Sequence, residues 1–412
     1  MTPKRAPICA GAALSGDAWR EVRLAAMFDC CKWDVQSRDH SVLANYPLFL
    51  DVKAWQEISR LADSLSLETL TAEREIFHRT EVHAKLGLPS SITAAIRACE
   101  EADMPTGAAR VMRFDFHFTH DGWRISEVNS DVPGGFIEAS GFTQLVSKHL
   151  SDNAKLCGDP AGAYATALAQ AAGSERTIAL VHATWHADDR QVMEYIARRL
   201  SEIGVKCALL APDEIEWDHG EPHRRGMTEK LPLLLARFFP AEWLPRIGAR
   251  PRWEPWFRGS RSPLSNPATA VLVQSKRFPL VWDALRTPLT QWRALLPETR
   301  SVRDLGGALE GWVLKPTLGR VGEDVAIEGV TAAGKFKKLY HHARGNESKW
   351  VAQRRFDTIP VATPDGMRYP CIGVFTIDGQ TAGAYGRVAA GPIVDEDAQD
   401  AAVLVRHGDG LD

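Results

Sequence analysis

The 412-residue sequence predicts a mixed α/β (α+β) fold made of several lobes. Three observations carry this prediction: a strand–helix–strand pattern over residues 177–211, a β-hairpin pattern over 111–129, and helical spacing of apolar residues over 17–102. A chain of this length corresponds to two or three domains at roughly 100–200 residues each.

The composition excludes several classes of protein. The 49 basic and 52 acidic residues give a net charge of −3, so a general nucleic-acid-binding surface is not expected. No run of 18 apolar residues occurs, so no membrane span is expected. The seven cysteines include no C-x-x-C pair, which fits reduced thiols in a cytoplasmic protein. For the adjacent Cys30 and Cys31, a buried structural role is a simpler interpretation than a redox pair.

The first hundred residues are expected to be mainly helical. Apolar side chains such as Ile58, Leu61 and Leu65 recur there at helical spacing. The texture changes at Val111, where aromatic and polar residues alternate along two segments that flank Asp121-Gly122. Alternation around an Asp-Gly turn is typical of a β-hairpin.

The middle of the chain carries the signature of a parallel sheet. Strands are expected over 177–181 and 206–210, with an amphipathic helix over 190–200 between them. The glycine motif of a dinucleotide site is missing, so this is not predicted to bind NAD. A further strand is expected over 233–239.

The last part of the chain returns to strands and turns. An aromatic helix is expected over 278–292, followed by strands over 312–316, 324–329, 350–353 and 371–375.

The hairpin carries the first candidate site. Residues two apart on a strand share a face, so Arg113 and Asp115 lie together, as do Glu127 and Asn129. Two carboxylates and an amide oxygen suit Mg²⁺, and a nearby arginine can stabilise a phosphoryl group in transfer. From spacing alone, an exposed polar face of a sheet is the simpler interpretation.

Two lysines and an acidic run are weaker candidates. Lys315 precedes a loop with Gly319 and Gly322, whose backbone N–H groups could approach phosphate oxygens, although the loop is not a Walker A sequence. Lys276 alone would be a solvated surface group. The acidic residues within 395–400 form either a solvated loop or a place for a cationic amine.

Taken together, these segments resemble the glutathionylspermidine synthase family, whose members are circularly permuted ATP-grasp ligases. The resemblance spans about residues 71–405, and its motifs occur in the family's order. The matching stretches are RFDF from Arg113, SEVNSD from Ser126 with Pro133, LARFF from Leu235, SK at Ser275, WVLKP from Trp312 with the loop to Glu323, WVAQ from Trp350 and AYGR from Ala384.

The resemblance implies roles at the metal and phosphate site. Asp115, Glu127 and Asn129 match the family's Mg²⁺ ligands, with Glu127 bridging two ions. Arg113 matches the arginine that stabilises the transferring phosphoryl group, and Ser130 is a further candidate.

It also implies roles around the nucleotide. Lys276 and Lys315 match the lysines that contact phosphates. Gln353 lies at the hinge that holds adenine, and Arg387 is a further active-site candidate. The lid over the triphosphate matches Gly319, Arg320 and Gly322.

The implied architecture is an ATP-grasp fold with an inserted, Rossmann-like pre-ATP-grasp subdomain. Its parts are a helical N-terminal region (1–105), the segment with the metal-binding hairpin (106–170), the pre-ATP-grasp subdomain (171–265) and the nucleotide-binding part with its lid (266–412). The amidase domain of bifunctional family members is not expected.

The implied activity is ATP-dependent ligation of a carboxylate to an amine through an acyl phosphate, with release of ADP and phosphate. ATP and two Mg²⁺ ions would be the cofactors, and the partners would be a small-molecule or peptide carboxylate and an amine. The alternatives are an ATP-grasp phosphotransferase and a catalytically silent nucleotide-binding protein. The identities of the acid and the amine, and the oligomeric state, are left open.

Overall fold

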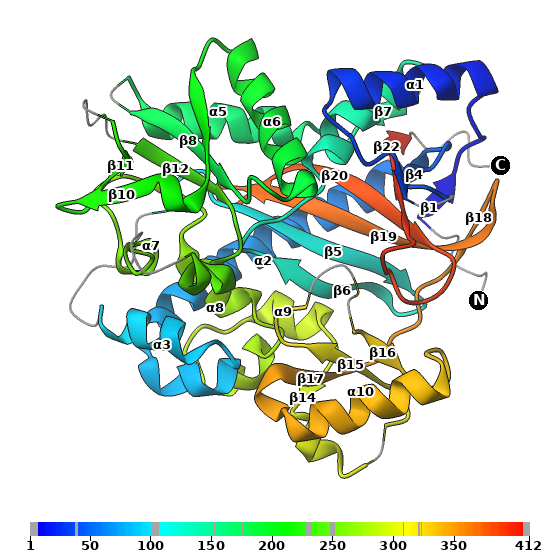
Figure 1. Ribbon diagram of the computed structural model, residues 1–412. Coiled ribbons are helices and arrows are strands. Elements are labelled where there is room, and N and C mark those ends of the chain that lie inside the picture. Colours follow the sequence, from blue (N-terminus) through cyan, green and yellow to red (C-terminus); the bar gives the residue numbers. More distant parts are fainter. Residues whose placement is uncertain are drawn as a thin grey trace.

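A six-stranded antiparallel sheet runs through the centre of the molecule (Figure 1). The computed structural model describes residues 7–37, 40–99, 107–150, 154–174, 176–227, 233–247, 252–307, 309–319, 322 and 324–406. Strand order in the central sheet is β21-β20-β19-β5-β6, with β18 pairing to β19. Its strands are β5 (Val111–Thr119), β6 (Gly122–Asn129), β18 (Val361–Thr363), β19 (Gly366–Ile377), β20 (Gln380–Ala389) and β21 (Gln399–Ala401).

The hairpin predicted from alternation is confirmed as β5 and β6, but it contains a bulge. Ile125 and Val128 both face the core although they lie three positions apart. Ser126 and Glu127 therefore lie together opposite Asp115. A bulge re-aims side chains and increases local twist, which is how Glu127 comes to lie beside Asp115 and not behind it.

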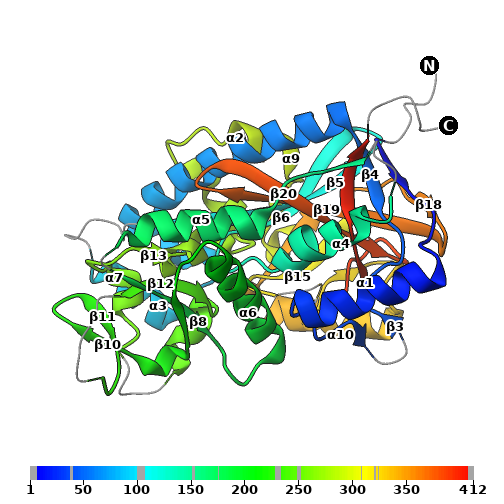
Figure 2. The ribbon, with the colours of Figure 1, turned by 90° about the horizontal axis from the view of Figure 1, so that it is seen from above.

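One face of the central sheet is covered by the long helix α2 (Val52–His78), as Figures 1 and 2 show. Asp51 caps the helix by accepting a hydrogen bond from the Lys53 backbone N–H (2.8 Å). Ile58 and Leu65, at helical spacing, are fully buried against the sheet's apolar face. Polar residues of β5 and β6, among them Arg113, Asp115 and Glu127, line a cavity instead of this core.

The N-terminal segment is less uniformly helical than the sequence indicated. Besides its helices it supplies short strands, which are too short to give a periodic signal. Two of these strands, β1 and β4, join a four-stranded sheet of order β1-β4-β22-β7, built from segments far apart in the chain (Figure 1). The elements are β1 (Ile8–Ala10), α1 (Gly16–Asp29), β2 (Gln36–Ser37), β3 (His40–Ser41), β4 (Leu48–Asp51), η1 (Thr80–Leu86), α3 (Ser90–Arg97), β7 (Ala154–Leu156) and β22 (Val403–Arg406).

The parallel sheet predicted in the middle of the chain is confirmed. Its order is β13-β12-β8-β9, and all three neighbouring pairs are parallel. Helix α5 packs on both this sheet and the central sheet, and so joins the two. The elements are η2 (Glu138–Phe142), α4 (Thr143–Ser147), α5 (Pro160–Ala172), β8 (Thr177–His182), α6 (Ala187–Glu202), β9 (Cys207–Leu210), η3 (Pro212–Glu214), β10 (Ile215–Asp218), β11 (Glu221–Arg224), β12 (Leu233–Phe238), η4 (Ala241–Arg246), α7 (Pro255–Arg258) and β13 (Leu264–Ser265).

The single aromatic helix expected over 278–292 was wrong, because two short helices take its place. Pro288 disfavours helical conformation at Thr287, and Leu289 adopts a left-handed conformation (φ 53°), so the helix breaks between them. Trp282 and Trp292, one on each helix, still pack edge to face. The elements are η5 (Ala268–Ala270), α8 (Val271–Gln274), η6 (Phe278–Ala284) and α9 (Thr290–Leu295).

A smaller antiparallel sheet of order β14-β17-β15-β16 forms a separate lobe with helix α10, at the bottom of Figure 1. The strands predicted over 312–316 and 350–353 are confirmed as β15 and β17. No helix among the described residues has both the length and the apolar character needed to cross a bilayer. The lobe consists of β14 (Thr299–Arg300), η7 (Val302–Leu305), β15 (Trp312–Pro316), β16 (Ala326–Ile327), α10 (Ala333–Gly345), η8 (Glu347–Lys349) and β17 (Trp350–Arg354).

Candidate functional site

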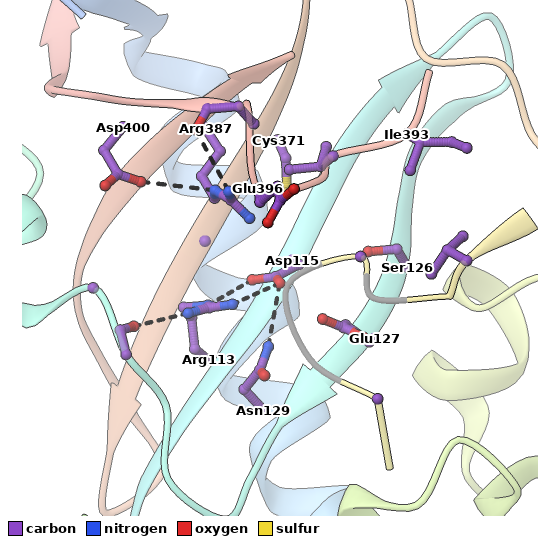
Figure 3. A pocket seen from close by; sticks show the side chains of 18 of the residues that line it. Arg113, Asp115, Ser126, Glu127, Asn129, Cys371, Arg387, Ile393, Glu396 and Asp400 are labelled. Carbon is purple, nitrogen blue, oxygen red and sulfur yellow. Dashed lines mark hydrogen bonds and ion pairs between the residues drawn. The ribbon is translucent and has the colours of Figure 1, made fainter. Parts of the chain in front are cut away.

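A cavity of about 840 Å³ opens on the polar face of the central sheet. It is lined by residues of the central sheet, of the β14–β17 lobe and of the segment around α6. Residues far apart in the sequence therefore meet in it. Figure 3 shows the part of the cavity around Asp115.

Arg113 and Asp115 form the centre of this face. The guanidinium of Arg113 donates to both carboxylate oxygens of Asp115 (Nε 2.7 Å, Nη2 2.8 Å) and to the carbonyl of Gly134 (2.8 Å) (Figure 3). Its Cζ lies 5.3 Å from the centroid of the Tyr385 ring. The arginine is thus held in one orientation by a bidentate ion pair and an aromatic face.

Tyr385 was missed in the sequence, although two glycines mark its place. A Cβ on Gly373 would lie 2.6 Å from the Tyr385 ring, and one on Gly135 would lie 2.8 Å from it. Gly373 also stands between Asp115 and Tyr385 in the sheet register. The absence of side chains at both glycines lets the tyrosine ring lie beneath Arg113.

Glu127 meets both candidate lysines. Its Oε2 lies 3.0 Å from the Nζ of Lys276. Burial alone would raise the pKa of Glu127, but Lys276 and Lys315 together lower it to about 2, so the carboxylate is ionised. Burial lowers the pKa of Lys315 to about 8, against the attraction of Glu127.

The hairpin oxygens fit a hard cation by their chemistry. Asp115 and Glu127 offer carboxylates, and Asn129 donates through Nδ2 to Asp115 (3.2 Å), which places its amide in the same group. Mg²⁺ favours such oxygen ligands and is usually held by only one or two carboxylates. Among the described residues, no three His, Cys, Asp or Glu side chains cluster as a metal site. The predicted set does not require such a cluster, since it combines two carboxylates with an amide.

The glycine loop after β15 reaches the same cavity. Lys276 donates from Nζ to the carbonyl of Gly319 (2.8 Å), and both glycines of the loop line the cavity. Gly322 has φ 67°, and a Cβ there would lie 2.5 Å from the carbonyl oxygen of Val394. The loop therefore meets the segment after β20 closely. The predicted lid residue Arg320 lies outside the described residues.

Gln353 is brought into the site, but its side chain serves Lys315. Its Oε1 accepts from the Lys315 Nζ (2.6 Å) and its Nε2 donates to Thr299 (3.4 Å). His117, also missed in the sequence, lies nearby against Phe356. Burial, reinforced by Lys315, lowers the pKa of His117 to about 3, so this histidine is neutral.

Of the two further candidates, Ser130 and Arg387, only Arg387 lines the cavity. Ser130 does not line the cavity: its hydroxyl is fully buried and donates to the carbonyl of Ala270 (3.2 Å). Arg387 does line it, on β20, where it donates to the carbonyl of Asp395 (2.7 Å) and lies 3.7 Å from Asp400 (Figure 3).

The other end of the cavity is acidic. Glu396 and Asp400 of the acidic run noted in the sequence line it, whereas Lys32, Asp34 and Glu138 were missed. Lys32, almost fully buried, lies 2.5 Å from Glu138, 3.1 Å from Asp34 and 3.5 Å from Asp400. Burial raises the pKa of Asp400 to about 6, against the attraction of Lys32. These residues are scattered over the chain, so no local spacing could have revealed the cluster.

The class of protein follows from the fold and this site. A mixed α/β architecture in which a small antiparallel sheet faces the polar side of a larger one is consistent with an ATP-grasp-like fold. The chain belongs to the family described as glutathionylspermidine synthase preATP-grasp, which it matches over residues 30–406. This confirms the family that the motifs suggested.

One solved structure supports the fold, and a second has a weaker likeness to the chain. A glutathione synthetase-like effector from Globodera pallida, in its apo form, aligns with a TM-score of 0.66 at 13% sequence identity, covering 94% of this chain and 96% of that one. A proposed gamma-glutamylcysteine synthetase from Methylobacillus flagellatus aligns with a TM-score of 0.44 at 12% identity, covering 82% and 84%. No curated protein matches the chain.

Proposed function

We propose that this protein is an ATP-dependent carboxylate–amine ligase that forms an amide and releases ADP and phosphate. One observation carries the proposal. Three cations, Arg113, Lys276 and Lys315, converge on the carboxylates Asp115 and Glu127 in one cavity, in a chain of the glutathionylspermidine synthase family. Cations for phosphate and oxygen ligands for Mg²⁺ are what phosphoryl transfer requires.

The order of elements supports a circularly permuted ATP-grasp arrangement. The metal-binding hairpin β5–β6 precedes the lobe with β15 and β17 in the chain, and β19–β20 follow that lobe. Both hairpins nevertheless pair in one sheet, through β5 and β19. The inserted parallel sheet around β8 and β12 would be the pre-ATP-grasp subdomain.

In the proposed mechanism, Lys276 and Lys315 bind the phosphates and Arg113 stabilises negative charge on the transferred group. Asp115, Glu127 and Asn129 would hold Mg²⁺, which neutralises phosphate charge when bound. The substrate carboxylate attacks the γ-phosphorus of ATP, which forms an acyl phosphate, and ADP is the leaving group. The amine then attacks the carbonyl carbon, and phosphate departs. The lid would exclude water from the reactive intermediate.

The test is a screen of ATP consumption over pairs of acids and amines, with products read by mass spectrometry. The expected result is ADP and phosphate together with an amide. A stable phosphorylated product without an amide would replace the ligase proposal with a phosphotransferase.

The site assignment is tested by Glu127→Ala. This change removes the carboxylate that would hold the metal, so we expect Mg²⁺-dependent turnover to be abolished while circular dichroism shows an intact fold. Undiminished ATP-dependent turnover in the variant would sink the assignment.

A further inference from the structure

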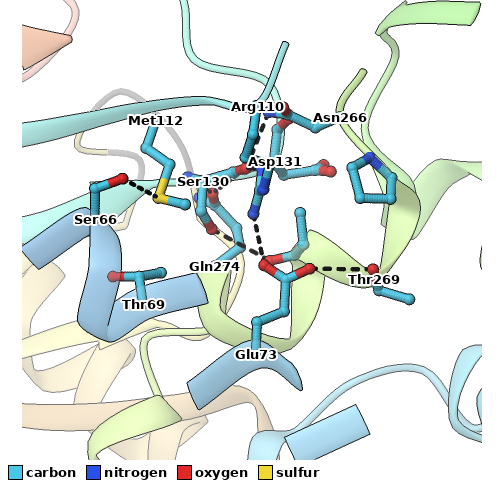
Figure 4. Close-up of polar contacts among 12 residues, drawn as sticks. Ser66, Thr69, Glu73, Arg110, Met112, Ser130, Asp131, Asn266, Thr269 and Gln274 are labelled. Atoms are coloured by element: carbon cyan, nitrogen blue, oxygen red, sulfur yellow. Dashed lines mark hydrogen bonds and ion pairs between the residues drawn. The ribbon is translucent and has the colours of Figure 1, made fainter. Parts of the chain in front are cut away.

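Gln274 is a half-buried residue at the wall of the cavity that links two parts of the site. Its Oε1 accepts from the backbone N–H groups of Ser130 (2.7 Å) and Asp131 (3.0 Å), as Figure 4 shows for this region. These two residues directly follow Asn129, the last residue of β6. A single side-chain oxygen thus fixes the backbone just beyond the predicted metal ligand.

The same residue lies close to the phosphate lysine in the chain. Gln274 ends helix α8, and Lys276 follows two positions later. The Nζ of Lys276 returns to Glu127 (3.0 Å), which is two positions before Asn129 on β6. The stretch 274–276 therefore contacts the stretch 127–131 at both of its ends, through Gln274 and through Lys276.

The backbone of Ser130 and Asp131 is also held through its carbonyl groups. The carbonyl of Ser130 accepts from Arg110 and from the Nδ2 of Asn266 (3.1 Å), and the carbonyl of Asp131 accepts from the same Nδ2 (2.7 Å) (Figure 4). Both peptide groups are thus bonded at the N–H and the carbonyl. Loss of the Gln274 bonds would shift Ser130 and Asp131 relative to Lys276, because the carbonyl bonds hold these two residues to Arg110 and Asn266 and not to α8.

We propose that Gln274 is a positioning residue that sets the spacing between the metal-binding hairpin and Lys276. The inference rests on the proposed function and deepens it, because Gln274 acts through Asn129 and Lys276. Removing the acceptor oxygen leaves two buried N–H groups unbonded, so the segment, still bonded through its carbonyls to Arg110 and Asn266, would shift away from α8. A displacement of about 1 Å in such a site can cost about 100-fold in rate.

The experiment compares Gln274→Met with Gln274→Glu in the full chain. Methionine keeps the length of the side chain but offers the two N–H groups only a weakly accepting thioether sulfur, whereas a carboxylate oxygen can still accept from both. Binding of ADP is measured by calorimetry across a Mg²⁺ titration, and kcat is measured at saturating ATP and Mg²⁺. For Gln274→Met we expect kcat to fall about 10- to 100-fold and the Mg²⁺ requirement for ADP binding to rise about tenfold. For Gln274→Glu we expect kcat and the Mg²⁺ requirement for ADP binding to stay close to the wild-type values.

Thr269→Val is the matched control. Its hydroxyl donates to Glu73 (3.1 Å) in the neighbouring buried network, which Glu73 shares with Arg110 (2.6 Å) (Figure 4). This change should lower thermal stability without altering kcat. If Thr269→Val reproduces the kinetic loss, Gln274 has only a structural role and the inference is overturned.

The remaining outcomes separate the two proposals. A wild-type protein that binds no nucleotide with Mg²⁺ overturns the proposed function and this inference with it. A wild-type protein that binds, with Gln274→Met binding and turning over equally well, overturns the inference alone. Where Gln274→Met does not fold, Gln274→Asn, which shortens the side chain by one methylene, provides the same comparison.

Discussion

At the scale of single residues, the Tyr385 ring beneath Arg113 makes a specific prediction. A cation–π contact contributes about 0.5–2 kcal/mol, so replacing the ring with Tyr385→Leu should lower kcat by roughly 2- to 30-fold. The affinity for ATP should change little, because in the proposed mechanism the phosphates are bound by Lys276 and Lys315. Tyr385→Phe keeps the ring and should retain activity. Steady-state kinetics on both variants decide the point, and equal losses in the two would show that the ring face is not what matters.

A second residue-scale prediction concerns Asp400. Burial raises the pKa of its carboxyl to about 6, above the value in an unfolded chain. The folded state therefore holds a proton that the unfolded state has lost between about pH 4 and pH 6. Stability contributed by this group falls as pH rises through that window.

Asp400→Asn removes this titration. Urea unfolding from pH 4 to pH 7 should show the free energy of unfolding of the variant rising relative to that of the wild-type protein as pH rises. Above about pH 6 the difference between the two free energies should stay constant. A stability difference between the two proteins that stays constant over the whole range would contradict the raised pKa.

At the scale of elements, the sequence was most informative where a pattern is local. The β5–β6 hairpin and the β8–α6–β9 unit each lie in one stretch, so alternation and helical spacing revealed both. The bulge at Ser126 and Glu127 was not predicted. The spacing of the core residues Ile125 and Val128 indicates it, because residues on one face of a regular strand lie an even number of positions apart and these two lie three apart. Most strands of two to four residues escaped, since they are shorter than a recognisable period.

Some residues of the site were likewise predicted from the sequence, and others were missed. The residues around Asp115 and Glu127, which the structure brings together in one cavity, were predicted as a site because resemblance to a family supplied what spacing alone left open. Tyr385 and the Lys32 cluster escaped because their partners come from distant parts of the chain. No property of position 32 in the sequence points to positions 138 and 400.

At the scale of the whole molecule, a buried ion pair fastens the parallel sheet to the central sheet. Arg237 on β12 pairs with Asp131, directly after β6, and the two side chains are 0% and 2% exposed. Breaking a buried pair by removing one partner leaves an uncompensated charge, which typically costs about 3–5 kcal/mol. We therefore expect Asp131→Asn to destabilise the protein by about that amount in urea unfolding.

Two further variants complete this test. Arg237→Met combined with Asp131→Asn removes both charges and should recover part of the loss. The exposed pair of Arg293 and Asp283 (2.8 Å) is the control, and Asp283→Asn should barely move the urea midpoint. Additive losses in the Asp131/Arg237 double variant would show that the two side chains are not coupled.

The four-stranded sheet that contains β22 has a consequence for synthesis in the cell. β22 lies between β4 and β7, so the ribosome must add more than 350 residues after β4 before its parallel partner exists. At about 5–20 residues per second, β4 waits roughly 20–70 s for that strand. An unpaired edge is a template for pairing with other chains, so nascent copies are exposed to misassembly throughout this interval. Demand for chaperones should therefore depend on how quickly translation passes through the message between β4 and β22.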